Sequence, residues 1–241
     1  MQDQEKIIQM FNQIAPSYDR LNRILSFGID KSWRKYACEL LIQKYINSKI
    51  TIADIACGTG DMIKYWQDTA YNFGANIAKI IGIDPSEKML EIAKKKYKNA
   101  VFIQSYASNT KLEDESCDII SISYGIRNII NRQEALNEFN RILKIGGYAV
   151  ILEFTQRQKK GFIAKIRDFY LGKILPKIGG FISKNPGAYE YLPSSIENFV
   201  SKETLREELL LAGFEVEILK SFSFDISTLF VARKVKFTDQ I

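Results

Sequence analysis

Apolar residues recur along this chain with two different spacings, and the two spacings alternate from about residue 50 onwards. Runs of β-branched residues predict buried strands, whereas apolar residues three or four positions apart predict amphipathic helices. Five strands are expected in the first two thirds of the chain, at 50–57, 80–83, 100–104, 117–122 and 148–153. Helices between them predict an α/β fold with a parallel, doubly wound sheet, which binds ligands at the carboxyl ends of its strands.

The strand-helix alternation is framed by other patterns. Residues 1–47 are expected to be helical, except that the mixed aromatic, amide and glycine content of 21–30 predicts either a solvated loop or a lid over a ligand. Gly146 and Gly147 are expected to end a helix over 132–143. The last residues predict a helix over 201–212 and an antiparallel hairpin of strands at 214–219 and 227–232. Five parallel strands followed by a late hairpin are typical of the seven-stranded class I methyltransferase fold.

Residues 157–200 interrupt the alternation with basic residues set among Phe, Ile and Leu. This composition predicts a helical, basic, amphipathic insertion after the fifth strand. One interpretation is a helix packed on the sheet with a solvated basic face. The other is a substrate cover that touches an anionic membrane surface. The whole chain, 1–241, is expected to be one domain, with 1–47 as a helical lid and 157–200 as the cover.

The chemistry is concentrated where the first strand ends in Gly58-Thr59-Gly60-Asp61. Glycines at this point leave room for a ligand to lie against backbone N–H groups at a helix start. Asp84 ends the second strand, where a carboxylate can accept both hydroxyls of a ribose. Asp61 is a poor neighbour for a diphosphate and a better one for a positively charged ligand. These features predict S-adenosyl-L-methionine, which carries an adenosine, an ammonium and a sulfonium, rather than a dinucleotide.

Composition narrows the chemistry further. The chain has no histidine, which removes the usual general base and every Ser-His or Cys-His arrangement. Cys38, Cys57 and Cys117 are scattered without metal spacing, so reduced thiols and no metal site are expected. The net charge of +6 is mild. No apolar run could span a bilayer and no signal peptide is recognisable, so a cytoplasmic protein, peripheral at the inner face of the membrane, is expected.

Several motifs together resemble one family, the quinone-biosynthesis C-methyltransferases that make menaquinone and ubiquinone. The resemblance covers nearly the whole chain and is carried by residues 18–33, 54–61, 123–128, 141–147 and 152–154. The first and third of these are specific to the family, whereas the second is shared by most methyltransferases of the class. The family usually has Met at position 21 and His at position 30, where this chain has Leu21 and Asp30.

The resemblance implies S-adenosyl-L-methionine as cofactor and transfer of its methyl group to a ring carbon of a reduced, prenylated quinol, converting demethylmenaquinol to menaquinol. It implies cofactor contacts by Thr59, Asp84, Tyr106, Ala107 and Ser123; Asp54, Gly58 and Gly60 are expected at the same pocket. Stabilisation of a phenolate-like oxygen is expected from Arg127, with Asn128 donating to it or positioning a water. Tyr18 and Asp19 are expected to close over the sulfonium, because aromatic faces attract cations.

Other functions fit parts of the pattern. Arg127 could instead pair with an acid, and Asn128 could cap a turn. A class I methyltransferase acting on RNA, DNA or another small molecule would share the fold and the basic charge. Enzymes that methylate nucleic-acid amino groups usually carry Asn/Asp-Pro-Pro-aromatic after the fourth strand, where this chain has 123–126 as Ser-Tyr-Gly-Ile, so no nucleic-acid partner is expected. The intact turn at 58–60 and Asp84 argue against a non-catalytic binding module.

Overall fold

The computed structural model describes residues 2–156, 186–223 and 225–236, and these build one seven-stranded sheet. The strand order is β3-β2-β1-β4-β5-β7-β6, with β7 antiparallel to its neighbours and the other pairs parallel. The strands are β1 (Lys49–Ile55), β2 (Asn76–Asp84), β3 (Val101–Gln104), β4 (Cys117–Ser123), β5 (Leu143–Glu153), β6 (Phe214–Phe222) and β7 (Ser227–Lys234). The order confirms the predicted doubly wound sheet and its late antiparallel hairpin.

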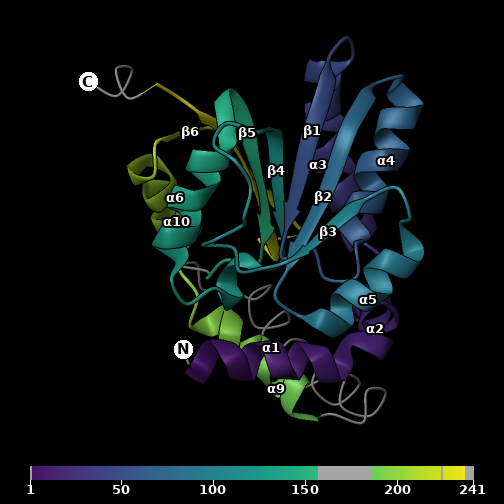
Figure 1. Ribbon diagram of the computed structural model, residues 1–241. Helices are drawn as coiled ribbons and strands as arrows, with labels where there is room; N and C mark the ends of the chain where they lie inside the picture. Colours follow the sequence, from purple (N-terminus) through teal and green to yellow (C-terminus); the bar gives the residue numbers. More distant parts are fainter. Residues whose placement is uncertain (1, 157–185, 224, 237–241) are drawn as a thin grey trace.

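Helices cover both faces of the sheet and its lower edge (Figure 1). The α-helices are α1 (Gln2–Ile14), α2 (Tyr18–Leu25), α3 (Asp30–Ile42), α4 (Asp61–Phe73), α5 (Glu87–Lys96), α6 (Arg132–Ile142), α9 (Pro186–Glu197) and α10 (Lys202–Leu211). Short 3-10 turns are η1 (Ala15–Ser17), η2 (Gln43–Tyr45) and η3 (Ile126–Asn128). Helix α1 runs across the carboxyl ends of the parallel strands, with α9 beside it (Figure 1).

The period-two pattern of each central strand decides which helices it packs against. In β1, Ala53 and Ile55 belong to the core cluster that contains residues of α6 and α10. Ile50 and Ile52 face the other way, into the cluster built with α3 and α4. Since a strand turns alternate side chains to opposite faces, a run of apolar residues in β1 can bury both faces at once.

The segment 21–30 is not the solvated loop that was one of its two interpretations, and the other interpretation, a lid over a ligand, stays a prediction. Tyr18–Leu25 is helix α2, and a second helix, α3, begins at Asp30. Leu21 is fully buried in a small cluster with Ile14, Ala15 and Met89. This packing of α2 against α1 and α5 outweighs the turn-like composition of the segment. The turn itself is confined to residues 26–29.

The prediction for Gly146 and Gly147 is also wrong, because β5 begins at Leu143 directly after α6. The pairing register advances from Leu143 to Tyr148 in β5 while it advances only from Cys117 to Ile119 in β4. The two glycines therefore lie in a bulge within a strand rather than in the turn that ends a helix.

The insertion after β5 is described only from residue 186, where α9 begins. The basic residues on which its prediction depends lie in 157–184, outside the described residues. Within the described parts of the chain, no helix has the length and apolar character needed to cross a membrane.

Candidate active site at the carboxyl ends of the strands

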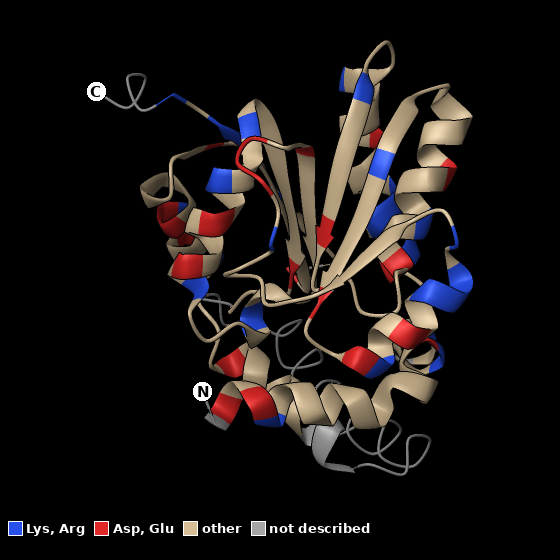
Figure 2. Cartoon of the chain, in the orientation of Figure 1, with Lys and Arg blue, Asp and Glu red and all other residues tan. Residues whose placement is uncertain are grey.

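Three carboxylates lie where the parallel strands end. Asp84 and Glu153 are the last residues of β2 and β5, and Asp54 is the second-last residue of β1. Figure 2 shows acidic positions at this end of the sheet, in an otherwise mostly uncharged strand region. All three residues are buried, so each carboxylate requires a partner or a ligand at this edge.

Asp84 fixes the glycine turn after β1. One of its carboxylate oxygens accepts the Gly58 backbone N–H at 2.8 Å, and the other accepts the Ser86 N–H at 2.8 Å. Burial raises the pKa of Asp84 to about 6, although both N–H donors oppose the shift. Gly60 follows with φ +88°, and a Cβ on it would lie 2.5 Å from the ring of Tyr97, so this position requires glycine.

Strained backbone marks the two strand ends at the switch in strand order. Ala56 follows β1 with φ +50°, and Tyr124 follows β4 with φ +60°. Both are left-handed conformations that non-glycine residues rarely adopt. A Cβ on Gly125 would lie 2.6 Å from the Cβ of Ala56, so these two turns are in close contact. Such strain is retained where the surrounding structure over-determines it, which is commonly at functional sites.

Within the described parts of the chain, three cavities lie at this edge. The turn cavity is lined by the glycine turn together with Arg34, Asp54, Asp61 and Ser123. The strand-end cavity lies beside it, against Asp84, Ala107, Ser123 and Asn128. The large cavity, of about 290 Å³, lies under α1, α2 and α9, and its lining is mainly aromatic and aliphatic.

The cavities share walls. Tyr18 lines all three cavities, and Phe11 and Tyr124 line both the large and the strand-end cavity. The ring of Tyr18 meets that of Phe11 edge to face, with centroids 6.1 Å apart. Burial raises the pKa of Tyr18, so its hydroxyl is neutral near pH 7. A ligand in the strand-end and turn cavities and one in the large cavity would therefore meet at Tyr18.

The turn cavity carries unsatisfied polar atoms. Among the described residues, three buried side-chain atoms have no hydrogen-bond partner: Nε of Arg34, Oδ2 of Asp54 and Oγ of Ser123. All three residues line the turn cavity. A buried polar atom without a partner is costly, so this convergence indicates a ligand with both donors and acceptors. The zwitterionic amino-acid end of S-adenosyl-L-methionine fits that description, and the carboxylate of Asp84 beside the strand-end cavity fits a ribose.

Asp54 differs from Asp84 in being only half-satisfied. Its Oδ1 accepts a hydrogen bond from Ser121 at 2.7 Å, and Ser121 also accepts the indole N–H of Trp66 at 2.9 Å. Burial raises the pKa of Asp54 to about 7, which the bond from Ser121 and the charge of Arg34 oppose. A cation placed at its free oxygen would favour the ionised form.

Arg127 lines the large cavity and is held by Glu153. The carboxylate of Glu153 accepts Nη1 of Arg127 at 2.7 Å and its backbone N–H at 3.2 Å. Nη1 also reaches the Tyr124 carbonyl at 2.6 Å, and Nε donates to Ser195 at 3.3 Å. Among the described residues no hydrogen bond from Nη2 is found, so Arg127 can pair with an acid and still have a donor for a ligand.

Asn128 and Asp19 do not line the large cavity that Arg127 lines. Asn128 lines the strand-end cavity, where its Oδ1 accepts the hydroxyl of Tyr191 at 2.9 Å and its carbonyl accepts Nε2 of Gln4 at 3.1 Å. It therefore connects α1 and α9 to the strand ends. Asp19 lines none of the three cavities; it pairs with Lys96 and accepts the hydroxyl of Thr59. The side chain of Asp19 is therefore bonded to the glycine turn through Thr59.

The structure brings together most of the residues that were predicted to contact the cofactor. Asp54, Gly58, Thr59, Asp84, Ala107 and Ser123 line the turn cavity, the strand-end cavity or both. Gly60 supports the turn without lining a cavity. Tyr106 is 47 % exposed and lines none of the three, whereas its neighbour Ala107 is buried. Of this pair, only Ala107 lines a cavity, and the predicted cofactor contact of Tyr106 stays a prediction.

Arg34 was not recognised from the sequence, nor was Asp30 placed in the site. Both lie on the buried stripe of α3, which also contains Trp33, Ala37, Cys38, Leu41 and Ile42. The sequence did contain a signal for this pair, because an Asp and an Arg stand four positions apart on an apolar stripe. Charged residues are almost never fully buried unless they are paired, so the two could have been expected to form a buried ion pair. Phe154, which stacks on Tyr124 with centroids 4.5 Å apart, was also missed as a cavity wall.

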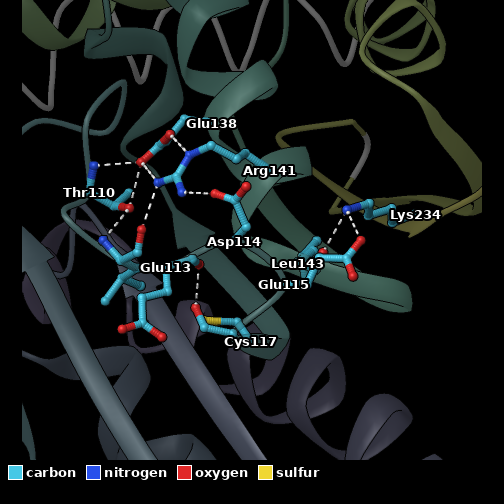
Figure 3. Close-up of polar contacts among 11 residues, drawn as sticks. Thr110, Glu113, Asp114, Glu115, Cys117, Glu138, Arg141, Leu143 and Lys234 are labelled. Atoms are coloured by element: carbon cyan, nitrogen blue, oxygen red, sulfur yellow. Dashed lines mark hydrogen bonds and ion pairs between the residues drawn. The ribbon is translucent and has the colours of Figure 1, made fainter.

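A polar network away from the cavities anchors the loop that carries Ala107. Oε1 of Glu138 accepts the backbone N–H of Thr110 at 2.8 Å and its hydroxyl at 2.6 Å (Figure 3). Arg141 binds Glu138 from the same helix, at 2.7 Å, and reaches the Leu112 carbonyl at 2.8 Å. Burial raises the pKa of Glu138, but the bonds from Arg141 and Thr110 outweigh it and lower the pKa overall. The network fixes the loop between β3 and β4 to α6.

Comparison with known proteins places the chain among methyltransferases. The model of the ubiE/COQ5 methyltransferase family matches residues 1–234. The ubiquinone/menaquinone biosynthesis C-methyltransferase UbiE of Campylobacter jejuni serotype O:6 is 60 % identical over 98 % of this chain and 100 % of its own length. The demethylmenaquinone methyltransferase of Thermotoga maritima is 39 % identical over 93 % of this chain and 94 % of its own.

Solved structures agree on the fold. An S-adenosylmethionine-dependent methyltransferase of Thermotoga maritima superposes with a TM-score of 0.60 at 21 % identity, covering 94 % of this chain and 98 % of that one. One from Aquifex aeolicus gives 0.57 at 18 % identity, covering 81 % and 88 %. These likenesses show the class I methyltransferase fold that the strand order predicts.

Proposed function

Because this chain belongs to the ubiE/COQ5 methyltransferase family, we propose that it transfers a methyl group from S-adenosyl-L-methionine to a ring carbon of a prenylated quinol. The reaction converts demethylmenaquinol to menaquinol, and serves menaquinone biosynthesis and, with a benzoquinol substrate, ubiquinone biosynthesis. The observation that carries the proposal is the shared wall at Tyr18, which joins a polar cofactor site to a large, mainly apolar cavity that is also lined by the guanidinium of Arg127.

The cofactor is held by residues at the strand ends. Asp84 accepts the ribose hydroxyls, Ala107 and Ser123 border the strand-end cavity, and Thr59 and Asp54 border the turn cavity. Bound S-adenosyl-L-methionine supplies a methyl group on a sulfonium: when the ring carbon bonds to that methyl group, the methyl–sulfur bond breaks and its electron pair stays on sulfur. Tyr18 offers an aromatic face to the sulfonium and orients the two ligands towards each other.

The large cavity suits the quinol. Its aromatic and aliphatic lining accepts an apolar ring and the start of a prenyl chain, and Nη2 of Arg127 is the donor available to a ring oxygen. Loss of a hydroxyl proton makes the ring carbon nucleophilic, and Arg127 stabilises the negative oxygen that results. After the carbon–carbon bond forms, the ring carbon loses its hydrogen as a proton to water and the oxygen regains one, so each turnover releases one proton.

The helices over the cavity form the cover in this proposal. Tyr191, Leu192 and Ile196 of α9, the described end of the insertion, line the large cavity together with Phe11 of α1. Asn128 is hydrogen-bonded to Tyr191 and Gln4, and so fastens both helices over the strand ends. Excluding water there strengthens the interaction of Arg127 with the developing oxyanion.

Contact with an anionic membrane surface is the remaining part of the proposal. A prenylated quinol resides in the bilayer, so the enzyme must meet it at the surface. The basic cluster at 157–184, outside the described residues, has the composition of an interfacial element. Each basic residue near an anionic leaflet contributes about 1 kcal/mol, screened by salt. Reversing Lys159, Lys160, Lys165 and Arg167 to Glu is expected to reduce salt-sensitive sedimentation with anionic vesicles; equal binding to neutral vesicles would remove this part of the proposal.

The proposed function is tested by methyl transfer with purified protein. Labelled S-adenosyl-L-methionine is supplied with demethylmenaquinol, demethylmenaquinone, RNA or DNA, and products are identified by mass spectrometry. Label on a ring carbon of the quinol is expected, with none on the quinone unless a reductant is added, because only the reduced ring is nucleophilic. Label on a nucleic acid, or none on any quinol while the cofactor binds, would contradict the proposal.

A further inference from the structure

The connection between α2 and α3, residues 26–29, carries two apolar side chains that are exposed and also line the large cavity. We call this connection the corner. Phe27 is 76 % exposed and Ile29 is 46 % exposed, and both border the large cavity. Every other described residue that lines this cavity is buried or half-buried. Because a side chain that borders a cavity and is also open to solvent marks its mouth, the large cavity opens at the corner.

A strained and hydrogen-bonded backbone presents Phe27 to solvent. Phe27 has φ +50°, a left-handed conformation that bulky residues rarely adopt, and Gly28 follows with φ +72°. The Oγ of Ser26 accepts the Gly28 N–H at 3.1 Å and donates to Oδ1 of Asp30 at 2.6 Å. Asp30 is in turn paired with Arg23 of α2. The exposure of Phe27 therefore belongs to a turn that the surrounding structure fixes.

The exposed apolar side chains are grouped. Ile24, in the last turn of α2, is exposed as well as Phe27 and Ile29. Single exposed apolar residues are normal on a protein surface, whereas a group of them at the mouth of an apolar cavity marks an interaction site.

The charges beside the corner favour an anionic partner. Arg20 in α2 and Lys31 in α3 are exposed and basic. The acidic residues of the same stretch, Asp19 and Asp30, are already paired with basic side chains. An apolar tip with basic residues on both sides has the composition of an element that lies in the interface of an anionic membrane.

We propose that the corner inserts into the interfacial region of an anionic bilayer and is the entrance through which the prenyl chain reaches the large cavity. This inference rests on the proposed quinol substrate, whose ring occupies the cavity while the rest of its chain stays among lipid tails. With Phe27 and Ile29 among those tails, the chain passes from lipid to cavity without exposing apolar surface to water. The corner lies outside the basic segment 157–184, so the two contacts can be tested separately.

Fluorescence of the full chain locates the corner relative to the lipid. Phe27→Trp places an indole at the corner, and the native Trp33 and Trp66 are buried. With vesicles of phosphatidylglycerol and phosphatidylcholine, we expect its emission to shift to the blue and to be quenched by bromine on the lipid acyl chains. Leu211→Trp is the matched control, because Leu211 is 82 % exposed and ends α10, on the opposite side of the molecule from α2 (Figure 1). The emission of this control should not respond to the vesicles.

Sedimentation and kinetics measure what the Phe27 side chain contributes. Phe27→Ser should weaken binding to these vesicles at least about fivefold, whereas Leu211→Ser should bind normally and Phe27→Trp should bind as the unaltered protein does. Demethylmenaquinol with a long prenyl chain is also supplied in vesicles, and a short-chain form in solution. Phe27→Ser should lower the ratio of the first rate to the second at least about fivefold. Circular dichroism checks that each variant is folded.

The outcomes separate this inference from the proposed function. No quenching in Phe27→Trp while the protein sediments with vesicles would overturn the inference, because the contact would then lie elsewhere. Unchanged vesicle binding or an unchanged rate ratio in folded Phe27→Ser would also overturn it. Failure of the unaltered protein to bind vesicles, with methyl transfer to dispersed quinol intact, would overturn it and leave the proposed function standing. Quenching at position 27 without transfer to any quinol would support the membrane contact and contradict the proposed function.

Discussion

The turn cavity and the large cavity share Tyr18 and Arg34 as walls but are built on opposite principles. The turn cavity contains three polar atoms that nothing in the described structure satisfies. In the large cavity the charged groups are already paired: Arg127 with Glu153, and Asp30 with Arg23 and Arg34. The turn cavity can therefore form new hydrogen bonds with a ligand, whereas the large cavity offers mainly apolar surface.

This difference fits the two ligands. A cofactor that carries three charged groups and a ribose is recognised by specific bonds, and loss of one bond leaves a buried group unpaired. A prenylated ring is recognised by area and shape, and needs one positioned charge where its oxygen becomes negative. Changes at the strand ends should therefore appear in cofactor affinity, and changes in the large cavity in turnover.

The largest expected effect is on turnover, from Arg127→Ala. Nη2 of Arg127 is the donor proposed for the developing oxyanion, and loss of such a donor costs about 10²–10³ in kcat. The dissociation constant of S-adenosyl-L-methionine should stay the same, since Arg127 lines only the large cavity. Single-turnover kinetics and calorimetry on the same preparation check both statements. A rate near normal would move the chemistry to another residue.

Glu153→Gln provides the matched control for that prediction. It keeps an oxygen acceptor for Arg127 but removes the charge that pairs with it at 2.7 Å. If Arg127 acts through a fixed orientation, Glu153→Gln should lower kcat by less than Arg127→Ala and leave cofactor binding unchanged.

A smaller effect is expected on the cofactor side, from Asp84→Ala. A buried ribose would lose its charged acceptor, and the Gly58 and Ser86 N–H groups would lose theirs, at a cost of about 1.5–3 kcal/mol. This corresponds to a roughly 10- to 150-fold weaker binding of S-adenosyl-L-methionine by calorimetry. Tyr106→Ala, at an exposed position outside the three cavities, is the control and should bind normally. Equal affinities in the two variants would refute the assignment of Asp84.

The same contrast explains how much the sequence could predict. The glycine turn, Asp84 and Ser123 were predictable because each lies directly at the end of a strand, and parallel strands bring such ends together. Parallel β1 to β5 and the late hairpin followed from the alternation of strand and helix patterns. In these cases local sequence carries the information.

The large cavity could not be predicted in this way. Its walls come from α1, α2, α3, η3 and α9, from the residues that follow β4 and β5, and from the connection between β6 and β7. Their meeting therefore depends on how the helices pack rather than on any local motif. Asp19 illustrates the limit: it pairs with Lys96 across a distance in sequence that no motif encodes, and its expected contact with the sulfonium stays a prediction. Arg34 was missed for the same reason.

The titration of Asp54 should make ligand binding in the turn cavity depend on pH. Burial raises its pKa to about 7, against the charge of Arg34 and with the charges of Asp84 and Asp61. A raised carboxyl pKa means that its contribution to the stability of the ligand-free protein is present at low pH and is lost as pH rises from about 4 towards 7. Cofactor binding changes in the opposite direction, because an ammonium requires the ionised form.

Affinity for S-adenosyl-L-methionine should therefore fall about tenfold from pH 7.5 to pH 6 through Asp54 alone. Asp54→Asn should bind more weakly at pH 7.5 and lose this part of the pH dependence, while keeping the part due to Asp84. Calorimetry at both pH values on the two proteins measures the difference. An identical pH dependence in both would show that Asp54 does not titrate in this range or does not contact the ammonium.

The smallest effect is expected from Glu138→Ala, in the polar network that fixes the loop between β3 and β4 to α6. The Thr110 N–H and hydroxyl would lose their acceptor, which costs about 1–3 kcal/mol in the free energy of unfolding. The loop carrying Ala107 would be less fixed, so the KM for S-adenosyl-L-methionine should rise severalfold. The KM for the quinol should stay unchanged, because no residue of that loop lines the large cavity.

Asp114→Ala is the control: it removes an exposed partner of Arg141 from the same network, seen in Figure 3, and should change neither the free energy of unfolding nor the KM for S-adenosyl-L-methionine appreciably. Denaturant unfolding and steady-state kinetics on both variants test these expectations. A rise in the quinol KM with Glu138→Ala would mean that the two cavities are coupled through the fold as a whole. The division between a hydrogen-bonding site and an apolar site would then describe the linings of the cavities but not their behaviour.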